Sequence, residues 1–295
     1  MPEKPGVAVV GNGVMGTAIA TRLLEVGHPV FVFDLDAAKA DALVAKGATR
    51  LVRSADALDR VDFVITSLNS AAIVKAAVFG ADGVAEKAAP GKMLIDMSSI
   101  DPNATREMAA LLKEKYGMDW VDAPLSGGAP KALVGKLTVM AGGTVENVEK
   151  ARLVMDSLCA NYSHMGPSGA GQTTKLVNQV LCALGFQAVA EAVRLAEAGG
   201  VDAARIPAAL AGGRADSNIL QEYGAKMAVR DYTPTGRIDN MLKDLDSVQA
   251  FAMAGKVPLP LTSAVTDLHR LFIAAGIGPE DSAAQMKYFD GFKAQ

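Results

Sequence analysis

The sequence predicts an α/β domain followed by an all-α domain, with a long interdomain helix joining them. Short apolar runs alternate with helical patterns over the first half of the chain, which indicates a parallel sheet covered by helices. Only helical patterns follow in the second half, and the first of them is long, at about residues 171–198. We therefore expect domains at residues 1–165 and 166–295.

Composition excludes several classes of protein. The 295 residues are 50% hydrophobic and 21% charged, with a net charge of -3, so no basic field is present to attract nucleic acid or an anionic membrane. The two cysteines, Cys159 and Cys182, have no metal-ligand or redox spacing, and the three histidines are scattered, so we expect no metal site. The N-terminus has no signal-peptide pattern, and we expect a cytoplasmic location.

A glycine turn follows the first apolar run, residues 7–10. A helical pattern comes next, and then a second apolar run, residues 30–33, that ends on Asp34, which lies 18 residues beyond the last glycine of the turn. This order is the fingerprint of a Rossmann dinucleotide-binding domain. The residues expected to bind the cofactor here are Gly11, Asn12, Gly13, Val14, Met15, Gly16 and Asp34.

Each part of the fingerprint has a physical role. Gly11 permits a tight turn, Gly13 lets the backbone approach a pyrophosphate, and Gly16 lets the helix pack closely on the strand. The helix N-terminus offers free N–H groups to the phosphates. Asp34 accepts hydrogen bonds from the ribose hydroxyls and repels a 2′-phosphate, which favours NAD over NADP. Asp36 is expected to be a helix N-cap.

Further strands are predicted near residues 50–51 and at residues 63–66, 93–96 and 120–124. The loops that follow two of them, at Leu68-Asn69 and Ser98-Ser99, belong to the edge where a doubly wound sheet binds its ligand. These four residues are candidates for cofactor contact, although Ser and Asn also serve as helix caps. A turn and one more strand are expected to close the domain by Gly143.

Ser126, Gly127 and Gly128 follow the strand that ends near Pro124. A serine before two glycines exposes backbone N–H groups, and these can hold a small anion together with the serine hydroxyl. A flexible surface turn is the alternative. Extra cations that a phosphate or sulfonate would need are absent next to Ser126, where Lys131 is the nearest, so a carboxylate is favoured.

Lys175 lies near the start of the long apolar helix, and Asn178 and Gln179 follow it at i+3 and i+4 on the same face. No charged residue occurs between Lys175 and Glu191. Apolar surroundings disfavour the ammonium form, so that an amine there can release and regain a proton near neutral pH. A lysine that only extends its amine to solvent is the alternative.

Three motifs in this order resemble the β-hydroxyacid dehydrogenase family: the glycine fingerprint, Asp-Ala-Pro-Leu-Ser-Gly-Gly at 122–128, and Gly-x-Gly-x-x-x-Lys-x-x-Asn at 169–178. Members include 3-hydroxyisobutyrate dehydrogenase and tartronate semialdehyde reductase. A Lys-Asp pair at Lys243-Asp244 is similar to a fourth family element. The resemblance covers nearly the whole chain, and the chain is too short to resemble full-length 6-phosphogluconate dehydrogenase.

The resemblance implies an NAD-dependent enzyme that interconverts a small 3-hydroxy acid and its semialdehyde by hydride transfer. It implies that Lys175 is the general acid/base, that Ser126, Gly127 and Gly128 hold the substrate carboxylate, and that Lys243 lies beside the nicotinamide. Either Asn178 or Gln179 would touch the substrate. It also implies a homodimer or homotetramer formed through the helical domain, with no nucleic acid or membrane partner.

The second half predicts helices at residues 207–210, 218–227, 238–254 and 262–275, separated by Gly and Pro. Arg237 is either an active-site cation or a solvent-facing residue. Alternative functions are a threonate dehydrogenase, a succinic semialdehyde or glyoxylate reductase, a non-catalytic dinucleotide-binding protein, and an imine reductase. Lys175 argues against the last two.

Overall fold

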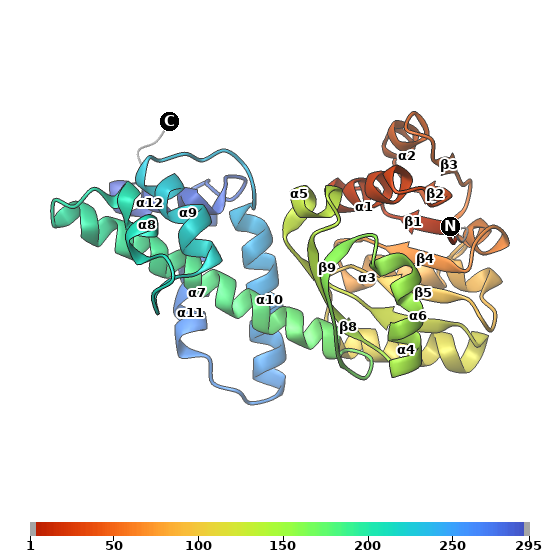
Figure 1. Ribbon diagram of the computed structural model, residues 1–295. Coiled ribbons are helices and arrows are strands. Elements are labelled where there is room, and N and C mark those ends of the chain that lie inside the picture. Colours follow the sequence, from red (N-terminus) through yellow and green to blue (C-terminus); the bar gives the residue numbers. More distant parts are fainter. Residues whose placement is uncertain (1–3, 292–295) are drawn as a thin grey trace. The chain divides into compact units, whose positions relative to one another are not determined.

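The computed structural model describes residues 4–291. It divides into two compact units, and the division falls between Lys175 and Leu176. Figure 1 shows strands in the first unit and helices alone in the second. The expected order, an α/β domain followed by an all-α domain, is confirmed.

A parallel sheet forms the first unit, and its strand order is β3-β2-β1-β4-β5-β6. This order reverses direction between β1 and β4, which is the topological switch point at which doubly wound sheets bind ligands. The strands are β1 (Val7–Val10), β2 (Val30–Phe33), β3 (Thr49–Arg50), β4 (Phe63–Thr66), β5 (Met93–Asp96) and β6 (Asp119–Asp122).

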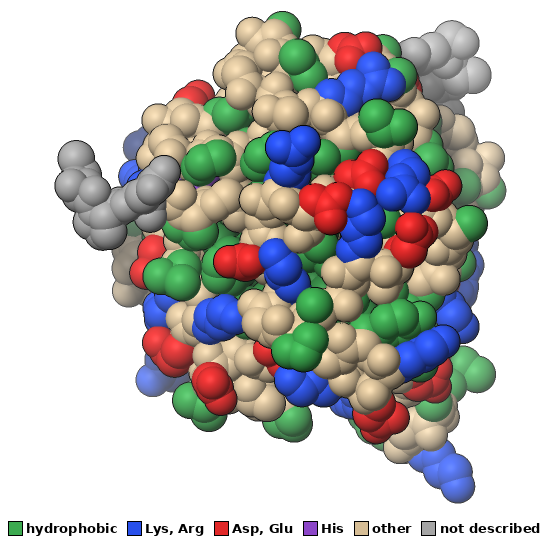
Figure 2. All heavy atoms as spheres, turned by 90° about the vertical axis from the view of Figure 1, so that its right-hand side faces the viewer, with side chains coloured by type: hydrophobic (Ala, Val, Ile, Leu, Met, Phe, Trp, Pro, Cys, Tyr) green, Lys and Arg blue, Asp and Glu red, His purple; other side chains and the backbone are tan. Residues whose placement is uncertain are grey.

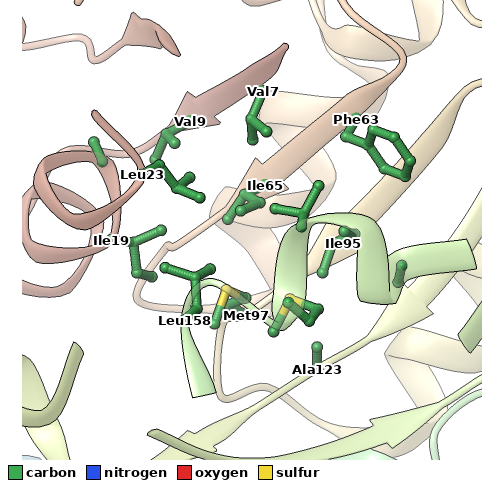
Figure 3. Close-up of a cluster of buried hydrophobic side chains, with 14 of the residues drawn as sticks. Val7, Val9, Ile19, Leu23, Phe63, Ile65, Ile95, Met97, Ala123 and Leu158 are labelled. Atoms are coloured by element: carbon green, nitrogen blue, oxygen red, sulfur yellow. The ribbon is translucent and has the colours of Figure 1, made fainter. Parts of the chain in front are cut away.

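Helices cover both faces of this sheet, so its central strands read as continuous apolar runs. The helices are α1 (Val14–Glu25), α2 (Ala37–Val44), α3 (Ala71–Phe79), α4 (Pro102–Tyr116), α5 (Gly128–Leu133) and α6 (Val145–Met155), with 3₁₀ turns η1 (Ser54–Asp59) and η2 (Val84–Lys87). Figure 3 shows one of the two cores, in which Ile19 and Leu23 of α1 meet Val9 and Ile65 of the sheet.

The sheet continues past β6 in a way that the sequence did not predict. β6 pairs antiparallel with β8 (Leu137–Gly142), which lies between β7 (Leu125–Ser126) and β9 (Cys159–Gly166). The expectation that one turn and one strand close the domain by Gly143 is therefore wrong, because α5, α6 and β9 were missed. A signal for α6 was present: Thr144 caps the backbone N–H of Asn147, and Val148, Ala151 and Val154 recur at helical spacing.

The expected strand at 120–124 also ends early, because β6 stops at Asp122. The other predicted strands and helices begin and end within two residues of the predicted positions. As expected, Asp36 caps α2, by accepting the backbone N–H of Ala38.

The second unit is built around α7 (Ala170–Ala198), whose first turns belong to the first unit. The helices that follow are η3 (Ala203–Arg205), α8 (Ile206–Leu210), α9 (Asn218–Ala228), α10 (Ile238–Ala254), α11 (Pro260–Ala274), η4 (Ser282–Gln285) and α12 (Met286–Asp290). The last two and η3 were not predicted. The core gathers along one side of α7, at Ala183, Phe186, Ala190 and Val193.

Among residues 4–291, α7 alone is long and apolar enough to cross a membrane by length and composition. Its buried apolar side chains from Ala183 to Val193 lie in the core of the second unit, as in the core helix of a globular protein. Side chains of Lys, Arg, Asp and Glu are interspersed on the molecular face shown in Figure 2, which shows no concentration of one sign of charge.

Candidate active site

The glycine turn between β1 and α1 has the geometry that each glycine was expected to provide. Gly11 has a φ of +93°, and a Cβ there would lie 2.5 Å from the backbone oxygen of Ser67. A Cβ on Gly16 would lie 1.8 Å from the backbone oxygen of Gly11, so the helix packs against the turn only because that position lacks a side chain. By contrast, a Cβ on Gly13 would meet open space. The protein therefore packs tightly around the turn at Gly11 and Gly16 and leaves open space beside Gly13.

The first turn of α1 follows this opening. Gly13 is its N-cap and supplies no side chain to the free N–H groups, and no acidic residue lies in the first turn. These N–H groups are available to an anion. Val14 is 80% exposed, whereas Met15 packs against the core. The side-chain amide of Asn12 is buried, and both of its polar atoms lack a protein partner. Together these features fit a bound pyrophosphate.

A groove of about 570 Å³ runs along the carboxyl ends of β1, β2 and β4. Gly11, Gly13 and Asp34 line it, and so do Leu68 and Asn69 from the loop after β4. It therefore brings five of the twelve cofactor candidates together at the switch point of the sheet, where a dinucleotide is expected.

Asp34 directly follows β2 and is fixed by two backbone N–H groups. Its Oδ2 accepts the N–H of Asn12 at 2.6 Å, and its Oδ1 accepts that of Asp36 at 2.8 Å. The two cations that line the groove, Lys39 and Arg53, are engaged by acids: Lys39 lies 3.5 Å from Asp36, and Arg53 bonds to three carboxylates, those of Asp56, Asp82 and Glu86. Neither of these two cations pairs with Asp34, whose negative charge therefore faces the groove without a cation from this pair.

Ser98 lies after β5 and is 97% buried, since its exposed fraction is 3%. Its Oγ accepts the backbone N–H of Leu68 at 3.0 Å, which ties the loop after β5 to the groove-lining loop after β4. Ser99 follows and is half-buried. Neither serine is the N-cap of α4, because Asp101 occupies that position. Ser98 thus supports the groove through Leu68.

A buried carboxylate that sequence reasoning missed lies under these loops. Asp96 accepts hydrogen bonds from Thr66 Oγ1 at 2.9 Å and from the backbone N–H of Ser98 at 3.1 Å. Burial raises the pKa of Asp96 to about 6, because desolvation penalises the charged form more than these hydrogen bonds favour it. Its position at the end of a predicted strand was the available signal.

Ser126, Gly127 and Gly128 form a strand-to-helix junction. Ser126 ends β7, and both glycines have positive φ values of 120° and 67° before α5 begins at Gly128. Gly127 is the N-cap of α5 and makes no side-chain hydrogen bond. The half-buried Ser126 is thus followed by two glycines in the left-handed conformation. Its hydroxyl and the backbone N–H groups of the turn form an arrangement suited to a small anion.

The start of α7 is held by a second missed carboxylate. Asp122, fully buried at the end of β6, accepts the N–H of Gly169 at 2.8 Å and that of Gln172 at 3.0 Å. Its negative charge lies at the positive end of a 29-residue helix. Burial raises the pKa of Asp122, and these N–H groups oppose the rise. Lys175 follows in the second turn, half-buried.

In the second unit, Asn178 and Gln179 continue α7. Gln179 is 93% buried, since its exposed fraction is 7%, and its Nε2 donates to Asp244. Lys243 Nζ lies 3.3 Å from the same carboxylate. Asn178 is half-buried and donates to Gln179 Oε1 at 2.8 Å. The Lys243-Asp244 pair and the residues after Lys175 are thereby joined.

The remaining candidates have structural contacts. Arg237 pairs with the carboxylate of Asp239 and is half exposed. His28 is buried between Pro5 and Ser157, and His269 is buried in the second unit. Within residues 4–291, no group of three or more His, Cys, Asp or Glu side chains is placed to hold a metal ion.

Comparisons with known proteins agree with this geometry. Residues 6–166 match the NAD binding domain of 6-phosphogluconate dehydrogenase, and residues 169–289 match the NAD-binding family of NADP-dependent 3-hydroxyisobutyrate dehydrogenase. The chain is 35% identical to an NAD-dependent L-serine dehydrogenase of Pseudomonas aeruginosa, over 98% of this chain and 99% of that one. It is 34% identical to a 2-hydroxy-3-oxopropionate reductase of Escherichia coli, over 93% and 94%.

Among solved structures, a 3-hydroxyisobutyrate dehydrogenase of Mycobacterium tuberculosis with L-serine superposes with a TM-score of 0.88 at 29% identity, over 97% of this chain and 99% of that one. The matched families cover both units, and the cofactor groove lies in the part that matches the NAD-binding domain. The chain therefore belongs to the β-hydroxyacid dehydrogenase family and is an NAD-dependent oxidoreductase.

Proposed function

We propose that this enzyme interconverts a small 3-hydroxy acid and its semialdehyde, with Lys175 as the general acid/base. The observation that carries the proposal is the placement of Lys175 in the second turn of α7, whose first turn is bonded to the loop after β5 at the cofactor edge. An amine held at that edge is suited to exchange a proton with a hydroxyl group that is losing a hydride.

The names of relatives support the substrate class. L-Serine and 2-hydroxy-3-oxopropionate both carry a carboxylate at C1 and an oxygen function at C3. In our proposal the carboxylate binds the Ser126 hydroxyl and the backbone N–H groups at Gly127 and Gly128. The C3 hydroxyl then faces Lys175.

The reaction needs one proton acceptor. NAD, when bound, supplies the hydride chemistry. As the alcohol is oxidised, its hydroxyl proton passes to the neutral amine of Lys175 and from there to solvent; in reduction, the ammonium returns a proton to the new alkoxide. Asn178, one turn after Lys175, orients the substrate oxygen. Gln179 is engaged by Asp244 and is buried, so we assign the substrate contact to Asn178.

We also propose NAD in preference to NADP. Asp34 would repel a 2′-phosphate, and the groove cations Lys39 and Arg53 are engaged by neighbouring acids. A cytoplasmic homo-oligomer formed through the helical unit completes the proposal. The exposed apolar side chains Val177, Leu181 and Leu195 of α7 support it, and light scattering on the purified protein measures the assembly directly.

The deciding experiment combines a substrate panel with two variants of Lys175. The panel holds L-serine, 3-hydroxyisobutyrate and threonate, each with NAD or NADP, and the semialdehydes of tartronate, methylmalonate and succinate, each with NADH or NADPH. Lys175→Ala is expected to lower kcat by roughly 10²–10⁴ while the Kd for NAD is retained.

Lys175→Arg is the matched control, because it keeps a positive charge that cannot be released near neutral pH. We expect the same loss in both variants. A Lys175→Arg enzyme of near-normal kcat would contradict proton transfer by Lys175. Intact NAD binding without turnover of any panel member would instead favour a non-catalytic dinucleotide-binding protein.

A further inference from the structure

Gln172 is a buried polar residue to which the reaction above gives no role. Its exposed fraction is 1%, and it occupies the first turn of α7. Its Nε2 donates to the backbone oxygen of Ser98 at 2.8 Å, and its Oε1 accepts the backbone N–H of Ile100 at 3.1 Å. One side-chain amide thus holds both ends of a three-residue loop segment that follows β5.

The backbone of Gln172 is fixed independently of its side chain. Its N–H donates to Asp122 Oδ2, and the N–H of Gly169 donates to Oδ1 of the same carboxylate. The space for this carboxylate exists because two glycines surround it: a Cβ on Gly142 would lie 2.6 Å from both Asp122 oxygens, and a Cβ on Gly171 would lie 2.8 Å from Oδ2. Asp122 therefore fixes where α7 begins.

The side chain of Gln172 restrains a different motion, the rotation of α7 about its own axis. A helix anchored at its first N–H groups can still rotate slightly about its axis, and a side chain bonded at two points to a neighbouring loop opposes that rotation. Residues at i and i+3 share one helix face, so Lys175 lies on the face of α7 that Gln172 turns toward the Ser98–Ile100 segment.

The same segment leads to the cofactor groove. Ser98 Oγ accepts the backbone N–H of Leu68, and Leu68 lines the groove. A continuous series of contacts therefore runs from the groove through Leu68, Ser98 and Gln172 to the helix turn that carries Lys175. All of these residues belong to the first unit.

We propose that Gln172 is a positioning residue. By bonding to Ser98 and Ile100 it sets the rotation of α7, so that Lys175 is held in register with the cofactor-edge loops for proton transfer. The proposal rests on the assigned role of Lys175. It adds that the position of the Lys175 amine relative to the cofactor is set by Gln172, whose side chain touches neither substrate nor cofactor.

The test is a double-mutant cycle. Gln172→Met keeps the length of the side chain and removes both hydrogen bonds. We expect kcat to fall by about 10–100-fold, with the Kd for NADH changed by less than about threefold, because a displacement of the order of 1 Å suffices for such a loss. In a Lys175→Ala background the same substitution is expected to change the residual kcat by less than about threefold, since its effect passes through Lys175.

A matched control separates positioning from simple destabilisation. Gln187 is another buried glutamine of α7, 94% buried, and it bonds only within its own helix, from Nε2 to Glu191 at 2.8 Å, in the contacts recorded for its side chain. Gln187→Met likewise removes a buried side-chain amide from α7, and it is expected to leave kcat unchanged. Should Gln172→Met not fold, Gln172→Asn enters the same cycle, because it keeps the amide on a side chain that is one methylene too short to bond to both Ser98 and Ile100 in the same way.

Three results would overturn the proposal: near-normal kcat in the folded Gln172 variant, an equal loss of kcat from Gln187→Met, or an undiminished loss in the Lys175→Ala background. Lys175→Ala on its own reports on the proposed function, since a normal kcat there removes the proton-transfer role. The two hypotheses are thereby tested by different arms.

Discussion

The Asp34 carboxylate accepts the backbone N–H of Asn12 at 2.6 Å, so the residue that we propose selects NAD also braces the glycine turn. This contact links the ends of two strands, because Asp34 directly follows β2 and Asn12 follows β1. Substitution of Asp34 is therefore expected to act on cofactor affinity in two ways, through the ribose and through the turn.

Asp34→Asn is expected to raise the KM for NAD by about tenfold, as a charged hydrogen-bond acceptor is lost. The KM for NADP should change less, because a carboxylate no longer repels its 2′-phosphate, so the preference for NAD falls. Steady-state kinetics with both cofactors measure this ratio. Asp41→Asn is the control, since Asp41 lies on α2 and pairs with Arg50, neither residue lines the groove, and the ratio is expected to stay as it is. A wild type that already prefers NADP would show the Asp34 assignment to be wrong.

Gly171→Ala tests the packing around the buried Asp122. A Cβ there would lie 2.4 Å from the backbone oxygen of Met140, an atom that cannot move without disturbing β8. We expect a loss of about 3 kcal/mol in the free energy of unfolding. Gly185→Ala in the same helix meets only the terminal methyl of Ile219 at 2.8 Å, and is expected to stay within about 1 kcal/mol of wild type. Chemical denaturation compares them, and equal losses would contradict the packing argument.

Asp96 is expected to make stability depend on pH. Burial raises the pKa of Asp96 from the ordinary 3.8 of an aspartate to about 6, so the folded state binds more protons between these values and stability falls as pH rises through that window. Asp96→Asn keeps the shape and removes the titration. The free energy of unfolding of Asp96→Asn relative to that of wild type should therefore rise by about 1 kcal/mol between pH 5 and pH 8. Urea denaturation at the two pH values measures the difference, and a gap independent of pH would refute the shifted pKa.

Asn178 and Gln179 are expected to differ when each is changed to Ala. Asn178→Ala should raise the KM for the hydroxy acid by about tenfold, because a substrate hydrogen bond is lost. Gln179→Ala should mainly lower the free energy of unfolding, by about 1–3 kcal/mol, since it removes a buried partner of Asp244. Kinetics and thermal denaturation of both variants distinguish the two roles. The reverse pattern would assign the substrate contact to Gln179.

The sequence by itself determined the parts of this protein that local chemistry dictates. Gly11 and Gly16 are required where a Cβ would strike backbone, and buried parallel strands must be continuously apolar, so the glycine turn, Asp34 and most strands could be placed from the chain alone. The long helix was equally clear, because its apolar pattern continues without Pro, and Gly171 and Gly185 are the two glycines in it. Motif resemblance supplied the remaining roles, including those of Ser126 and Lys175.

Only the tertiary structure revealed Asp96, Asp122 and Gln172 as parts of the site's support. The partners of Gln172 lie more than 70 residues earlier in the chain, at Ser98 and Ile100, and no local pattern predicts a contact across that separation. β9 was missed for a similar reason, since a strand with alternating exposure is defined by its pairing with β8. Local propensity identifies the elements and the reacting groups, whereas the register that holds one reacting group against another depends on buried contacts that form when distant segments pack.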